Sequence, residues 1–252
     1  MSSLNKIVTV HSFRRSVGKS SLAANLASLL ALQGQRVGLV DSDFQGASAH
    51  LFFGLAEDKI THTFNDFMWK KGDIINAAQD VTASLGEAAQ GKLFLVPSST
   101  SISEIMQILR TNMNLERYIE GLDTLKSELK LDILLVDTPA GLNENTLMSI
   151  AVSNVLVLVL HPDKQDFQGT AVIVDVARKL LVPAIHLVLN DISETLDHEQ
   201  VILEIEQNYQ TGKSVTLPHA EELLALGSTR PFVVEYPNHP LTARITDLAQ
   251  HL

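Results

Sequence analysis

The sequence contains no cysteine, which excludes disulfide bonds, thiolate zinc sites and a cysteine nucleophile. Long apolar runs are also missing: the longest candidate, Val155–Leu160, is only as long as a strand, whereas a bilayer span needs about 18 apolar residues. The first residues lack the apolar core of a signal peptide. We therefore expect a soluble, cytoplasmic protein.

Positive charge is scarce. The formal net charge is −10, and from residue 165 onward five Lys/Arg residues face twelve Asp/Glu residues. Because binding to a nucleic-acid backbone depends on cations, this balance argues against a broad nucleic-acid footprint. We leave nonspecific DNA binding open, on the condition that dimerisation gathers basic residues, such as Lys70 and Lys71, on one face.

The last fourteen residues, 239–252, have apolar side chains at helical spacing but a single arginine. Membrane capture by an amphipathic helix usually combines apolar burial with basic charge. We therefore expect this segment to pack on the core, and we do not expect membrane binding.

Apolar runs of strand length alternate with helical patterns along the chain. Continuous apolar runs are typical of strands covered on both faces, and this alternation is typical of a parallel sheet. We predict an α/β fold with a doubly wound, mostly parallel sheet flanked by helices on both faces, in one domain covering residues 1–252. The strand runs are 7–10, 36–41, 92–97, 132–137, 155–160 and 184–190, and the helical patterns are 20–32, 63–78 and 102–129.

The residues after the first predicted strand carry the core of a phosphate-binding loop. Gly18, Lys19 and Ser20 stand where a strand, a loop and a helix are expected to follow one another. A helix N-terminus offers unpaired N–H groups to an anion, a lysine there reaches the β- and γ-phosphates, and a serine hydroxyl ligates Mg²⁺. We predict that the residues Val17, Gly18, Lys19, Ser20 and Ser21 bind nucleotide phosphates, with Mg²⁺ at Ser20.

This loop is poor in glycine. The general pattern Gly-x-x-x-x-Gly-Lys-Ser/Thr has glycine where this chain has Phe13, and Arg14, Arg15 and Ser16 come next. Residues such as Arg15 and Ser16 tolerate positive φ poorly. We therefore expect either an unstrained loop or phosphate binding that is weaker than usual.

Aspartates follow two further predicted strands. Asp41 and Asp43 come after the second apolar run, and Asp137 ends a buried one. A carboxylate in that position can hold Mg²⁺, usually through water, because this ion keeps much of its hydration shell. Each aspartate alone could simply cap the next segment, and only the combination with the Gly-Lys-Ser core favours a magnesium site.

Four motifs stand in order along the chain. They are the loop Arg14–Ser20, the Asp-x-Asp pair and turn at Asp41–Gly46, the strand end Asp137-Thr138-Pro139, and Asn190 followed by a loop around Pro218. Together they resemble the motifs of the ParA/MinD family of partition and positioning ATPases, which have a P-loop NTPase fold of the SIMIBI type. The chain is identified as a divergent member, with Arg14 in place of the family's early loop lysine.

The resemblance implies a role for each motif. Lys19 and Ser20 would hold phosphate and Mg²⁺, Asp137 would support the metal ion with help from Asp41, and Asp43 would position the attacking water. Asn190 and the loop of Pro218 would bind adenine. The family sandwiches ATP between two subunits, so the expected cofactors are ATP and Mg²⁺, and the expected partners are a second copy of the chain and an activating protein.

Two residues are candidates for a contact across the dimer. By the resemblance, Arg14 occupies the position of the lysine that crosses to the partner's phosphates, and an arginine can fork onto phosphate oxygens. Lys164 follows the run 155–160 at the ligand edge of the sheet and could supply the missing lysine, although a solvated loop lysine is the commoner situation. No role for Arg15 follows from the sequence.

Three functions remain as alternatives. The preferred one is an ATP-binding dimerisation switch with slow hydrolysis, used to position or partition a cargo. A nucleotide-binding scaffold that has lost turnover comes second, and an ATP-dependent small-molecule ligase on the same fold comes third. A GTPase is disfavoured because the chain reads Asn190-Asp191-Ile192-Ser193 where guanine recognition needs Asn-Lys-x-Asp.

Overall fold

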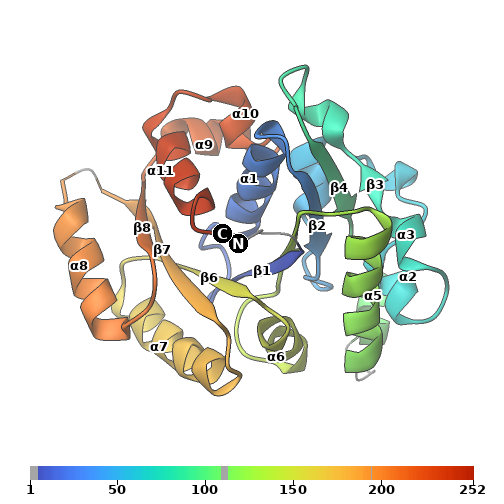
Figure 1. Cartoon of the computed structure of the whole chain (residues 1–252), viewed down its shortest axis with the longest axis horizontal. Helices are drawn as coiled ribbons and strands as arrows, with labels where there is room; N and C mark the ends of the chain where they lie inside the picture. Colours follow the sequence, from blue (N-terminus) through green and yellow to red (C-terminus); the bar gives the residue numbers. More distant parts are fainter. Residues whose placement is uncertain (1–4, 109–112, 194) are drawn as a thin grey trace.

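A computed structural model describes residues 5–108, 113–193 and 195–252. Within these residues an eight-stranded sheet runs through the molecule in the order β3-β4-β2-β5-β1-β6-β7-β8 (Figure 1). The short β3 pairs with β4 in antiparallel fashion, and the remaining pairs are parallel. The strands are β1 (Lys6–His11), β2 (Arg36–Asp41), β3 (Gln79–Asp80), β4 (Lys92–Val96), β5 (Ile133–Asp137), β6 (Val155–Leu160), β7 (Ala184–Ile192) and β8 (Ser214–Pro218).

Helices cover both faces of the sheet. In Figure 1, α1, α10 and α11 lie on one face, and α6 and α7 lie on the other. The expected doubly wound α/β architecture is confirmed. The helices are α1 (Lys19–Leu32), α2 (Phe64–Met68), α3 (Ile74–Ala77), α4 (Ile102–Ile108), α5 (Leu115–Glu128), α6 (Glu144–Ala151), α7 (Lys164–Lys179), α8 (His198–Tyr209), α9 (Glu221–Leu226), α10 (Phe232–Glu235) and α11 (Pro240–Ala249), with 3-10 turns η1 (Ala49–Phe53), η2 (Glu57–Lys59) and η3 (Thr82–Leu85).

The continuous apolar strands are buried on both faces, as the sequence predicts. All six residues of β6 are buried, and so are all five of β5. On one face they pack against α1, α10 and α11, and on the other against α5, α6, α7 and α8. Leu241, Ile245 and Leu248 of α11 are buried in this core, so the expectation that the C-terminal segment packs on the core is confirmed.

Two predicted helices are interrupted. The pattern over 63–78 forms α2 and α3, because Lys70 takes a left-handed conformation (φ 61°) that ends the first helix. Residues 102–129 form α4 and α5 rather than one helix, and the segment 109–112 between them lies outside the described residues. None of the helices described is long and apolar enough to cross a membrane.

Strand register determines where the polar strand ends meet. Asp137 at the end of β5 lies beside Asp41 at the end of β2 and beside Val10 near the end of β1. Ligands bind beyond the carboxyl ends of the strands in open parallel sheets. The predicted phosphate loop and the aspartates therefore share one edge of the sheet.

Candidate nucleotide-binding site

The phosphate loop joins β1 to α1. Gly18 precedes the helix in a left-handed conformation (φ 91°), which glycine adopts without steric cost. No side chain among the described residues caps this helix, so its first N–H groups remain open to an anion. The local geometry is that of an anion site at a helix N-terminus.

Ser16 is also left-handed, with φ 62°. Of the two alternatives expected from the sequence, the unstrained loop does not hold at this residue, and weaker phosphate binding stays a prediction. A residue with a Cβ atom pays about 1–2 kcal/mol for this conformation. The chain thus holds the loop in a conformation that glycine would adopt more easily, although it has serine there.

Lys19 and Asp137 form a buried ion pair. The Nζ of Lys19 lies 2.9 Å from Oδ1 of Asp137, and the two side chains are 8% and 1% exposed. Burial alone would lower the pKa of Lys19, but the Asp137 carboxylate outweighs it and raises this pKa above its ordinary value. Lys19 is therefore a fixed positive charge at the base of the loop.

Asp41 organises the segment that follows β2. Its buried carboxylate accepts hydrogen bonds from the backbone N–H groups of Asp43, Ser48 and Ala49, each at 3.0 Å. Burial, together with the charge of Asp137, raises the pKa of Asp41 to about 7 against the effect of these hydrogen bonds. The predicted support of the metal by Asp41 stays a prediction; what its geometry does is hold the loop that carries Asp43.

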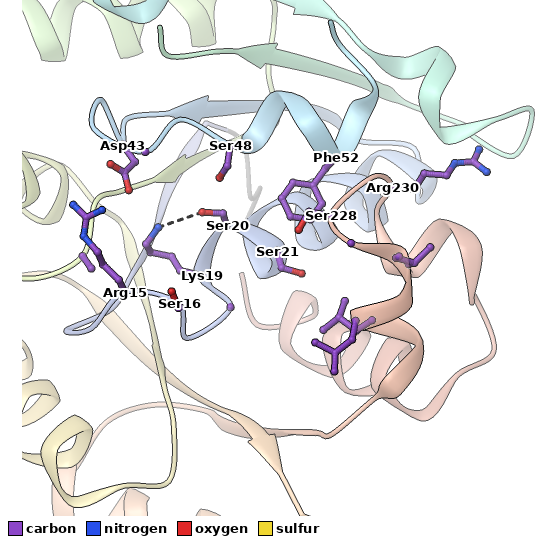
Figure 2. A pocket seen from close by; sticks show the side chains of 17 residues that line it. Arg15, Ser16, Lys19, Ser20, Ser21, Asp43, Ser48, Phe52, Ser228 and Arg230 are labelled. Atoms are coloured by element: carbon purple, nitrogen blue, oxygen red, sulfur yellow. Dashed lines mark hydrogen bonds between the residues drawn. The ribbon is translucent and has the colours of Figure 1, made fainter. Parts of the chain in front are cut away.

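A cavity of about 570 Å³ opens in front of these residues. Gly18, Lys19, Ser20, Ser21 and Asp43 line it, so the structure brings together the core of the predicted phosphate and water sites (Figure 2). The opposite wall comes from α9 and the segment after it. The other lining residues are Arg15, Ser16, Gly46, Ser48, Phe52, Ala140, Leu223, Leu224, Leu226, Gly227, Ser228 and Arg230.

The donor set suits a hydrated Mg²⁺ ion. Oδ2 of Asp137 is buried and has no hydrogen-bond partner among the described residues. The Ser20 hydroxyl, which lines the cavity, lies 3.4 Å from Nζ of Lys19. Ser20 and Asp137 thus both contact Nζ of Lys19, and a hydroxyl and a carboxylate are the hard-oxygen ligands that Mg²⁺ takes, directly or through water. Ser20 and Asp137 would hold the ion.

Arg14 lies outside this cavity. Its Nη1 is 2.7 Å from Oδ2 of Asp163, and its Nε is 3.4 Å from Oδ1 of Asp166. The guanidinium thus rests on the start of α7 in its own chain. Lys164, the first residue of α7, is exposed and does not line the cavity either.

Neither of the two predicted adenine contacts lines the main cavity, although Asn190 lines a small pocket that shares Gly18 and Ser21 with it. The Asn190 amide donates to the backbone carbonyl of Val17 at 2.9 Å, which braces the phosphate loop from behind. Pro218 lines a separate cavity of about 690 Å³ together with His219. Adenine contacts at Asn190 and Pro218 stay predictions.

Sequence reasoning missed a buried histidine beneath the loop. His11 is fully buried, and its Nδ1 lies 2.7 Å from the hydroxyl of Thr138. Burial and the nearby charge of Lys19 lower the pKa of His11 to about 3, so the ring is neutral. A single histidine with no motif around it gives no signal in the sequence. Arg230 and Phe52 were missed as well, because no motif marks them.

The chain is similar to known proteins in sequence and in fold. The AAA_31 family, described as an AAA domain, matches residues 5–185. The uncharacterised ATP-binding protein MJ0547 of Methanocaldococcus jannaschii is 26% identical over 250 residues, which cover 97% of this chain and 86% of that protein. An iron-sulfur cluster carrier protein of Deinococcus radiodurans is 31% identical over 186 residues, 73% of this chain and 48% of that protein.

A solved structure has the same fold. The septum site-determining protein MinD of Pyrococcus horikoshii OT3, complexed with Mg-ADP, superposes with a TM-score of 0.78 at 20% sequence identity, covering 98% of this chain and 95% of that one. The family expected from the sequence motifs is confirmed. The chain therefore belongs to the AAA_31 family of AAA domains and has the P-loop fold of the MinD and ParA ATPases.

Proposed function

We propose that this chain is a single-domain, ATP-dependent dimerisation switch that binds MgATP, hydrolyses it slowly and positions or partitions a cargo in the cytoplasm. The observation that carries this proposal is the cavity in which Lys19, Ser20 and Asp43 face one another at the open N-terminus of α1. Its volume of about 570 Å³ is within the range of pockets that take small ligands.

The chain's own residues divide the work. The first N–H groups of α1 and the ammonium of Lys19 bind phosphate oxygens, where the helix dipole and a fixed cation favour negative charge. Asp43 accepts a hydrogen bond from the attacking water and orients it toward the terminal phosphate. Ser20 and Asp137 would hold Mg²⁺, which would neutralise phosphate charge.

Slow turnover is proposed because of the loop. Arg15 and Ser16 stand in a loop that is poor in glycine, and Ser16 holds a conformation that glycine prefers. Such a loop adapts to the transition state less freely than one with glycine. Slow hydrolysis prolongs the ATP-bound dimer, which suits a switch whose signal depends on that dimer.

An iron-sulfur carrier role is not extended to this chain. The Deinococcus relative carries that name, but these 252 residues contain no cysteine. Iron-sulfur clusters are held mainly by cysteine thiolates. A second copy of the chain and an activating protein are the proposed partners; nonspecific DNA stays open, and a membrane is not expected.

Phosphate release tests the enzymatic part of the proposal. Wild-type protein with ATP and Mg²⁺ should release phosphate slowly. The Asp43→Ala variant should release phosphate at a rate lower by about 10²-fold or more while still binding ATP. Asp58→Ala, which removes an exposed carboxylate that does not line the cavity, is the matched control and should keep wild-type turnover. Wild-type protein that binds ATP tightly but releases no phosphate would favour the nucleotide-binding scaffold. Wild-type protein that binds no nucleotide would reject the site.

A further inference from the structure

Arg15 of the phosphate loop has no assigned role. It is exposed, and its side chain lines the same cavity as Lys19 and Ser20. Figure 2 shows it at the end of the cavity where Asp43 lies, whereas Ser228 and Arg230 lie at the other end. The hydrogen bond that the structure gives its guanidinium among the described residues runs from Nη2 to the neutral Oε1 of Gln45, at 3.2 Å.

The neighbouring arginine is committed elsewhere. Arg14 is paired with two carboxylates of α7, one of them on the buried Asp166. If Arg14 left this site, Asp166 would keep a buried oxygen without a cation, which is costly. Arg15 has a single bond to an exposed amide to give up, so it is the cation of the loop that can turn to a ligand at the lowest cost.

Negative charge gathers at this end of the cavity, so a second cation beside Lys19 would favour phosphate binding there. Asp41, Asp43 and Asp137 bring three carboxyl groups to this edge of the sheet, and the charge of Lys19 is already balanced by Asp137. Arg230 is 3.0 Å from Glu235 and lies at the far end. An ATP molecule carries its largest charge on the terminal phosphate, so a free guanidinium next to Asp43 offsets the repulsion there.

We propose that Arg15 binds the terminal phosphate of the ATP held in its own subunit and thereby gives the site its preference for ATP over ADP. The inference rests on the proposed function in that it takes this cavity as the nucleotide site. Arg14 then acts as a positioning residue that fixes the loop on α7. A guanidinium donates two N–H groups in a fork that matches two phosphate oxygens.

The test is titration calorimetry of the full chain with Mg²⁺ and either ADP or AMPPNP, an ATP analogue that is not hydrolysed. The variants are Arg15→Ala, Arg15→Lys and Arg14→Ala. Arg244→Ala is the matched control, because it removes an exposed arginine of α11 that does not line the cavity. Each titration is run at two protein concentrations, one below and one above the concentration at which the protein dimerises.

Arg15→Ala should lower the affinity for AMPPNP about tenfold or more and change the affinity for ADP less than about twofold. Arg15→Lys should recover part of the loss, because it restores the charge without the fork. Arg14→Ala should change both affinities by the same factor, as expected for a residue that shapes the loop, and Arg244→Ala should change neither.

The inference is overturned if Arg15→Ala keeps the wild-type ratio of the two affinities. A loss of AMPPNP affinity that occurs only at the higher protein concentration would move the contact to the partner subunit and would also overturn it. The two proposals fail in different ways. Wild-type protein that binds neither nucleotide rejects the nucleotide site itself. A preference for AMPPNP over ADP that is the same with and without Arg15 rejects only the role of Arg15.

Discussion

The ammonium of Lys19 lies 2.9 Å from the carboxylate of Asp137, with both side chains buried at the carboxyl edge of the sheet. The lysine comes from the first turn of α1 and the aspartate from the end of β5, so the pair ties the phosphate loop to the centre of the fold. It also leaves Oδ2 of Asp137 free of hydrogen bonds among the described residues. The same contact contributes to stability and lies at the site proposed for the cation and the phosphates.

Breaking this pair should destabilise the protein. Lys19→Met or Asp137→Asn alone should lower the free energy of unfolding by about 3–5 kcal/mol, because each leaves a buried charge without its partner. The double variant Lys19→Met/Asp137→Asn should cost clearly less than the sum of the two. Urea unfolding of the four proteins measures the coupling, and strictly additive losses would show that the pair does not exist in solution.

Gly18 and Asn190 are coupled by close packing. A Cβ atom added to Gly18 would lie 2.3 Å from Nδ2 of Asn190, at a backbone angle of φ 91°. Gly18→Ala should therefore lower the free energy of unfolding by about 2–3 kcal/mol, of which about 1 kcal/mol comes from the left-handed backbone. In an Asn190→Ala background, which also loses the bond to Val17, the same change should cost about 1 kcal/mol.

Thermal or urea unfolding of these three variants and the wild type checks this point. Asn190→Ala alone supplies the control for the lost hydrogen bond. An equal cost of Gly18→Ala in both backgrounds would contradict the packing of Asn190 against the loop.

His11 should make stability depend on pH. Its pKa is about 3 in the folded chain and about 6.5 in the unfolded chain, so below pH 6.5 the unfolded chain takes up a proton that the folded chain does not. This contribution is complete above pH 6.5 and is lost as the pH falls toward 3. Between pH 7 and pH 5.5 it amounts to about 1 kcal/mol.

A His11→Gln variant removes this titration and can still bond to Thr138. Its free energy of unfolding should fall less than that of the wild type between pH 7 and pH 5.5, by the same 1 kcal/mol or so. The other histidines titrate equally in both proteins. Parallel pH profiles for the two proteins would mean that His11 is reached by solvent.

Arg14 should matter for folding. Because it is the cation beside the buried Oδ1 of Asp166, Arg14→Ala should lower the free energy of unfolding by about 1–3 kcal/mol. Replacing Asp166 by Asn in the same protein should reduce that cost, since no buried charge is then left. Chemical denaturation of the two single variants and the double variant measures this, and an Arg14→Ala protein as stable as the wild type would refute the contact with α7.

Much of the fold can be predicted from the sequence, because strands buried on both faces have continuous apolar runs. The runs 132–137 and 155–160 correspond to β5 and β6 almost residue for residue. The carboxyl ends of such strands meet at one edge, so Asp41, Asp43 and Asp137 could be placed near Lys19 before any coordinates. Local conformation was harder to predict: nothing in the pattern over 63–78 shows that Lys70 turns left-handed.

Side-chain partners distant in the sequence could not be predicted. Arg14 and Asp163 are separated by 149 positions, and no local pattern shows that the arginine turns to α7 rather than to the cavity. The hydrogen bond from Asn190 to the backbone of Val17 spans 173 positions, and no local pattern predicts it either. Motifs give the type of residue at a site, whereas tertiary packing decides which of two adjacent arginines lines the cavity.

The proposed switch requires that ATP makes this chain dimerise. Light scattering with Mg²⁺ and either ATP or ADP tests it most directly, on wild type and on Asp43→Ala, which should hold ATP longer. The account predicts a mass near 27.6 kDa with ADP and about twice that with ATP, with the larger species more persistent in Asp43→Ala. The same mass with both nucleotides, in both proteins, would contradict the dimerisation switch.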